Sequence, residues 1–160
     1  MSRVIRVKAP AEPAPEGSHR AVVVAVTELG LQPRFGGEGE VFQYGVCLAF
    51  PEQKRTDGQI HRLWLTATES LHPKSTLGQI TSAAALMPDI GEEFDPQRLV
   101  GANITVLINH VVKADGKTFA NAVAYTKFTG TPYKLNGTTF EMPDWLVAKK
   151  NSRLDAETNF

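Results

Sequence analysis

The sequence contains a single cysteine, Cys47, so the chain cannot form an intramolecular disulfide. This residue lies within an apparent strand, which favours a buried, reduced thiol over a reactive nucleophile and suits a reducing compartment. The chain also lacks an apolar run of about 18 residues, the length that a membrane-spanning helix needs. Its first residues lack the apolar segment of a signal peptide. We therefore expect a cytoplasmic protein that has no contact with a membrane.

An excess of charge of one sign is missing as well. The chain has 17 basic residues (Lys and Arg) and 17 acidic residues (Asp and Glu), so its formal net charge at pH 7 is zero. This balance argues against a protein that coats duplex DNA by bulk charge alone, although it leaves room for a local basic groove. Any interpretation as a nucleic-acid-binding protein therefore depends on where the charged and aromatic side chains lie.

The sequence patterns of metal and catalytic sites are also missing. The four histidines are scattered without ligand spacing, and one cysteine cannot form a Cys-x-x-Cys motif. The glycine-rich stretch FGGEGE lacks the Gly-Lys-Ser/Thr ending of a phosphate-binding loop. No serine or cysteine nucleophile stands beside a base in a local signature. We therefore predict no metal, no cofactor and no enzymatic activity.

Short stretches rich in β-branched and aromatic residues, separated by glycine, proline and polar turns, predict five strands. These stretches are HRAVVVAVTELG, VFQYGVCLAF, IHRLWLTATES, NITVLINHVV and TFANAVAYTKF. One other stretch, LHPKSTLGQITSAAALMPD, changes to helical spacing, with Leu77, Ile80, Ala84 and Met87 on one face. The predicted order is strand, strand, strand, helix, strand, strand.

This order of elements is that of the OB-fold, a small, partly open Greek-key barrel of five strands. Short strands with one apolar face bury that face by curling into a barrel, and the helix between the third and fourth strands then plugs one end. We therefore predict an all-β OB-fold domain with one helix, spanning residues 18–130. The Pro/Ala/Glu-rich residues 1–17 are predicted to form a flexible arm, and residues 131–160 a C-terminal extension. An open antiparallel sandwich is the alternative.

The third predicted strand has an unusual outward face. Because strand side chains alternate between faces, Leu63 and Leu65 point to the core, whereas Arg62 and Trp64 point away from it. The small or uncharged residues expected beside them on the second strand are Gln43, Gly45, Cys47 and Ala49. OB-folds bind oligonucleotides on the face of these two strands. Two interpretations of Trp64 are open: its ring stacks on a base, or it is covered by the N-terminal arm or the C-terminal tail.

Other candidate nucleic-acid-binding residues combine rings and positive charges, because bases stack on aromatic rings and Lys and Arg neutralise phosphates. They are Arg34 and Phe35 in the glycine-rich loop, Tyr44 on the second strand, and Lys113, Lys117 and Phe119 around the last hairpin. A structural role is an open alternative for each of them. Tyr44 shares the parity of the core-facing residues of its strand, and Phe119 shares that of Val123 and Tyr125. The two lysines flank an Asp-Gly turn, where charge is also expected for solvation.

Three segments of the chain together resemble the OB-fold single-stranded DNA-binding proteins of bacteriophages. They are PEGSHRAVVVAVTELGLQ, TESLHPKSTLGQITSA and FDPQRLVGANITVLINHVVKADGKTFANAVAY, within about residues 15 to 128. The resemblance implies sequence-independent binding and protection of single-stranded DNA in phage or prophage DNA replication, recombination or repair, in the cytoplasm of a bacterial host. An OB-fold module that binds proteins and no nucleic acid is the alternative, which the neutral net charge favours.

The C-terminal residues LDAETNF resemble the acidic tips, closing on phenylalanine, with which bacterial and some phage single-strand-binding proteins dock replication and recombination partners. Asp155, Glu157 and Phe160 carry this resemblance. An ordinary disordered end is the alternative. Upstream, Trp145 and Leu146 are predicted to pack on the barrel or to contact another protomer. We expect a homo-oligomer, in the simplest case a dimer, formed through an exposed strand edge or the C-terminal segment.

Overall fold

The computed structural model describes residues 12–33, 39–134 and 143–150. The loop candidates Arg34 and Phe35, and the C-terminal candidates Asp155, Glu157 and Phe160, lie outside the described residues. Their predicted roles therefore stay predictions. The remaining candidate residues are all in the described part of the chain.

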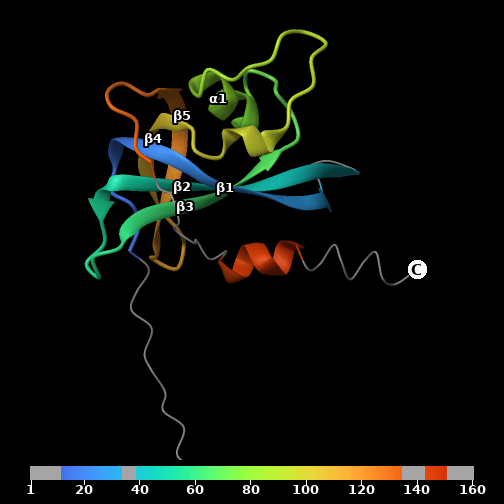
Figure 1. The fold of residues 1–160 in the computed structure, drawn as a ribbon. Coiled ribbons are helices and arrows are strands. Elements are labelled where there is room, and N and C mark those ends of the chain that lie inside the picture. The colour runs from blue at the N-terminus through green and yellow to red at the C-terminus, as the bar shows by residue number, and fades with distance from the viewer. Residues whose placement is uncertain (1–11, 34–38, 135–142, 151–160) are drawn as a thin grey trace, which may run out of the picture.

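Five strands form a single antiparallel sheet (Figure 1). They are β1 (Gly17–Pro33), β2 (Glu40–Lys54), β3 (Ile60–Thr68), β4 (Asn103–Val112) and β5 (Thr118–Lys127). Between β3 and β4 the chain forms the helix α1 (Thr76–Ala83) and the 3-10 helix η1 (Pro96–Leu99). Residues 144–150 are helical and are called the C-terminal helix below. Among the described residues, no helix combines the length and apolar character that crossing a bilayer requires.

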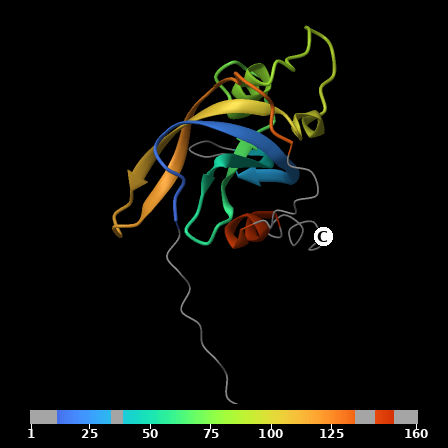
Figure 2. The same ribbon diagram turned by 60° about the vertical axis from the view of Figure 1, so that its left-hand side comes forward.

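The strand order in the sheet is β3-β2-β1-β4-β5. Strand β1 belongs to both halves, because Gly17–Val22 pairs with β4 and Val22–Pro33 pairs with β2. A register shift between Val23 and Ala25 lies near this change of partner, and such irregularities bend a strand and increase its twist. Strands β3 and β5 end the order without pairing to each other, so the described sheet is curved but not closed (Figure 2). The structure thus confirms a mainly β domain with a barrel-like sheet.

The hydrophobic core lies between α1 and one face of the sheet. Val46, Leu48 and Phe50 of β2 are fully buried there, as their alternation in the sequence predicts. From the helix, Leu77 and Ile80 pack into the same core. We call this the inner face of the sheet and the opposite side the outer face.

Helix α1 is shorter than the predicted amphipathic stretch. It begins after Ser75, whose hydroxyl oxygen accepts a hydrogen bond of 3.0 Å from the Gly78 amide. It ends at Ala83, just before Ala85, which has a positive φ of 57°. Met87 therefore lies beyond the helix and is exposed, whereas the spacing of apolar residues predicted it on the apolar stripe.

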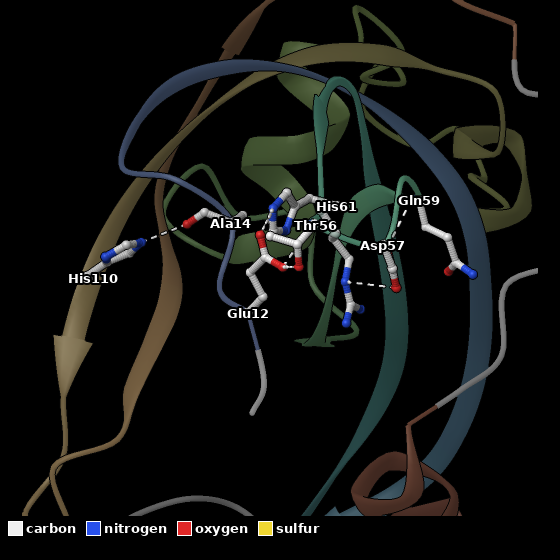
Figure 3. A network of polar contacts seen from close by, with 8 residues as sticks. Glu12, Ala14, Thr56, Asp57, Gln59, His61 and His110 are labelled. Carbon is white, nitrogen blue, oxygen red and sulfur yellow. Dashed lines mark hydrogen bonds and ion pairs between the residues drawn. The ribbon is translucent and has the colours of Figure 1, made fainter. Parts of the chain in front are cut away.

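Residues 12–16 contact two separate parts of the sheet (Figure 3). In the turn between β2 and β3, Thr56 donates hydrogen bonds to Glu12 Oε2 from its amide (3.1 Å) and its hydroxyl (2.9 Å). The hydrogen bond from the Thr56 amide is the main reason that the pKa of Glu12 lies below its usual value. On β4, His110 Nε2 donates a 2.7 Å hydrogen bond to the Ala14 carbonyl. Part of the predicted flexible arm is therefore packed against the folded domain.

Candidate nucleic-acid interface

The outer face of the sheet carries Arg62 and Trp64. In the pairing of β2 with β3, Trp64 lies opposite Cys47 and Arg62 lies opposite Ala49. The alternate residues Leu63 and Leu65 pack against the core on the inner face. The parity predicted for the third strand is therefore confirmed, and Arg62 and Trp64 lie next to each other on the side away from α1.

The C-terminal helix lies on this outer face, on the opposite side of the sheet from α1 (Figures 1 and 2). Leu146 is fully buried, and a Cβ atom on Gly45 would lie 2.9 Å from Leu146 Cδ2. The Gln32 side chain donates a 3.0 Å hydrogen bond to the Lys149 carbonyl, and burial lowers the pKa of Lys149. Leu146 is thus the predicted packing anchor, and the missing side chain of Gly45 makes room for it.

A pocket of about 440 Å³ lies where β3 meets the C-terminal helix. Its lining residues are Arg55, Arg62, Leu63, Trp64, Pro143, Asp144 and Trp145. The lining therefore combines two indole rings and two guanidinium groups with one carboxylate. Trp145, half exposed at 53%, was not among the predicted binding residues, because nothing in the local sequence indicates that its helix returns to β3.

Two N–H donors in the lining of this pocket are buried and have no hydrogen-bond acceptor among the described residues. They are Trp64 Nε1 and Arg55 Nε. Asp57 Oδ2 lies 3.8 Å from Arg55 Nε, close enough for an ion pair but too far for a hydrogen bond. A buried donor without a partner costs about 1–3 kcal/mol. Because both atoms are enclosed, this cost arises within the fold and does not identify a ligand for the pocket.

A second aromatic and cationic cluster, around Arg20 on β1, was missed by the sequence-based prediction. The Arg20 guanidinium carbon lies 5.4 Å from the centroid of the Phe128 ring, and the Phe128 and Tyr133 rings lie 6.3 Å apart in an edge-to-face arrangement. Two hydrogen bonds between the Asn103 side chain and the Tyr133 backbone, of 2.9 and 3.2 Å, hold this segment on the sheet. Glu52 lies 3.8 Å from Arg20 and partly neutralises it. The outward parity of Arg20 was the signal available in the sequence.

The hairpin of β4 and β5 extends away from the C-terminal helix (Figure 2) and carries three predicted residues. Lys113 Nζ lies 4.6 Å from the centroid of the Phe119 ring, and Phe119 is exposed. A register shift in the β4–β5 pairing reverses the parity along β5, so Tyr125 packs against the core while Phe119 does not. Lys117 is exposed in the turn, where its amide donates to Asp115 Oδ1. These three residues are accessible but lie apart from the pocket.

Tyr44 is not accessible, although it was predicted as a binding residue. Its side chain belongs to the core cluster with 7% exposure, and its hydroxyl donates a 2.9 Å hydrogen bond to Glu69 Oε2. Burial is the main cause that raises the pKa of Tyr44 to about 12. Tyr44 alternates in step with the inner-face residues of β2, and this decides its position. Its predicted role as a stacking residue is therefore replaced by a role in the core.

Neither a model of a known protein family nor a curated protein sequence matches this chain. The interpretation of its function therefore depends on the geometry of the outer face. Within residues 12–33, 39–134 and 143–150, no three His, Cys, Asp or Glu side chains gather as metal ligands would.

Cys47 gives a test of how tightly the outer face is packed. The side chain is fully buried, and burial raises the pKa of the thiol to about 12. Because the thiolate is the reactive species, we expect the folded protein to resist iodoacetamide at mildly alkaline pH, whereas protein unfolded in guanidinium reacts completely. Intact-mass spectrometry measures both reactions. Rapid modification of the folded protein would show that this face is open to solvent.

Proposed function

We propose that this chain binds single-stranded DNA without sequence preference, through the outer face of its sheet. The pocket lined by Trp64, Trp145, Arg55 and Arg62 is the observation that carries this proposal. Bases stack on aromatic side chains for about 1–3 kcal/mol each, and every base has a π-face, so such a site tolerates any sequence. Guanidinium groups beside the rings neutralise the phosphates between successive bases.

The strand arrangement supports the assignment to the OB-fold. The sheet has five antiparallel strands, a first strand shared between two partners, and a helix between β3 and β4 in the chain. In OB-folds the face of the second and third strands binds oligonucleotides. The pocket lies on the outer face at β3, which agrees with that location.

The biological role that we propose is the protection of exposed single strands during phage or prophage DNA replication, recombination or repair in the host cytoplasm. It rests on the resemblance of the three sequence segments described above. A net charge of zero agrees with a DNA-binding site in which only a few local cationic groups contact the phosphates. We further propose that the chain forms a dimer through an exposed strand edge or the C-terminal segment, and that Asp155, Glu157 and Phe160 dock replication or recombination proteins.

A protein-binding module is the second candidate function, and one feature of the β4–β5 hairpin favours it. Five apolar side chains are exposed there: Leu107, Val111, Val112, Phe119 and Val123. Val111 and Phe119 are directly paired across the two strands. Exposed apolar groups gathered on one element are typical of protein contact surfaces.

Fluorescence titration with a thymine oligonucleotide at two salt concentrations separates the two candidates. We expect saturable quenching of the tryptophans, with an affinity that falls as salt rises. If both pocket arginines contact phosphates, the slope of log K against log salt is about −1.4, from about 0.7 per neutralised phosphate on a single strand. A duplex of the same length should bind more weakly. A folded protein that binds no oligonucleotide at low salt would contradict the proposal and favour the protein-binding module.

A further inference from the structure

The C-terminal helix holds its position on the outer face through contacts that leave Trp145 uncovered. Leu146 is fully buried, while the adjacent Trp145 is 53% exposed. Large aromatic side chains are usually well buried. A half-exposed indole beside a buried anchor therefore needs an explanation, and Trp145 lines the same pocket as Trp64.

From this arrangement we infer that Trp145 is a second stacking platform, and that one base of the bound strand lies in the pocket between β3 and the C-terminal helix. The inference rests on the proposed function and adds to it, because it makes a segment after the last strand part of the DNA-binding site. The pocket volume of about 440 Å³ is within the range of about 300–1,000 Å³ that ligand sites occupy.

The charges of the pocket fit a nucleotide with its phosphate. The lining carries two positive side chains, Arg55 and Arg62, and one negative side chain, Asp144. Asp57 lies 3.8 Å from Arg55 and offsets part of its charge. Both arginines line the pocket and can contact the phosphate, and Arg62 shares its strand face with Trp64. The remaining charged side chain, Asp144, leaves the lining with one more positive than negative group.

The contacts of the helix with Gly45 and Gln32 hold it on the face where the strand is proposed to bind, so the effect of removing Trp145 on DNA affinity tests its role. If Trp145 stacks on a base, the change is a loss. If the helix instead covers the site, the change is a gain.

The experiment uses the full chain, which has two tryptophans, so that each single variant leaves one indole as the reporter. Binding of a labelled thymine oligonucleotide is measured by fluorescence anisotropy for the parent, Trp145→Ala, Trp145→Phe and Val147→Ala. We expect Trp145→Ala to weaken binding about 5- to 150-fold, the equivalent of one base stack. Trp145→Phe should retain most of the affinity, and Val147→Ala, in the same helix but outside the pocket lining, should match the parent.

A second readout is the emission of Trp145 itself in a Trp64→Ala protein. We expect unlabelled oligonucleotide to quench this emission at saturation, because the base contacts the remaining indole. Parent-like or tighter binding by Trp145→Ala would overturn the inference while leaving single-strand binding intact, and tighter binding would identify the helix as a cover. Absence of binding by the parent would instead overturn the proposed function, and the inference with it.

Discussion

Replacing Trp64 by alanine is expected to weaken binding of a thymine oligonucleotide about 5- to 150-fold, since stacking on one ring contributes about 1–3 kcal/mol. Trp64 lies on a paired strand, opposite Cys47, and Arg62 is its neighbour on the same face of that strand. The sheet, and not a loop, therefore positions the Trp64 ring. A site built on a strand loses little entropy on binding. The loss should be similar for oligonucleotides of different base composition, because stacking reads no sequence.

Two variants serve as controls for this measurement. Trp64→Phe keeps an aromatic ring and should bind within a few-fold of the parent. Ile90→Ala removes a fully exposed apolar side chain outside the pocket lining and should leave the affinity unchanged. Thermal unfolding monitored by circular dichroism establishes that each variant is folded. If the Trp64→Ala protein is folded and binds like the parent, Trp64 on β3 does not contact the DNA.

Replacing Gly78 by alanine is expected to destabilise the protein, which reverses the usual effect of this substitution in a helix. Alanine normally stabilises a compatible helical position by about 0.4–1 kcal/mol. Here the new Cβ would overlap the carbonyl oxygen of His72 and lie 2.9 Å from the carbonyl carbon of Leu71. The Ser75 hydroxyl, 2.8 Å from the carbonyl oxygens of both Ser70 and His72, holds this backbone in place. Because backbone must shift, we expect a loss of about 1–3 kcal/mol in the free energy of unfolding.

Ser82→Ala is the matched control, because Ser82 is exposed in the same helix. It should change the free energy of unfolding by less than about 0.5 kcal/mol. Denaturation in urea measures both variants. Equal or greater stability of Gly78→Ala would mean that α1 does not approach the preceding segment as closely as the structure places it.

Much of the sheet could be predicted from alternation along single strands. Val46, Leu48 and Phe50 were expected on the inner face and are buried there, and the opposite parity of Arg62 and Trp64 is what the structure has. These predictions succeed because side chains in a strand alternate with a local period of two. The same reasoning failed along β5, where a register shift lets Tyr125 pack against the core while Phe119 does not.

The part of the candidate pocket that the C-terminal segment contributes could not be predicted in this way. Trp145 and Asp144 come from a helix far along the chain from β3, and they line the pocket because Leu146 fits over Gly45. The sequence around Trp145 does not indicate which surface its helix covers. Similarly, Phe128 and Tyr133 approach Arg20 because Asn103 hydrogen-bonds the backbone of Tyr133.

The sequence by itself therefore determined the five strands, the helix α1 and the outward direction of Arg62 and Trp64, since each follows from periodicity over a few neighbouring residues. The tertiary structure alone decided where strand β1 changes partner, which strands lie at the two ends of the described sheet, and which segment faces Trp64. Those features depend on which distant surfaces are complementary in shape. A glycine without a side chain on β2 and a leucine on the C-terminal helix meet only in the folded chain.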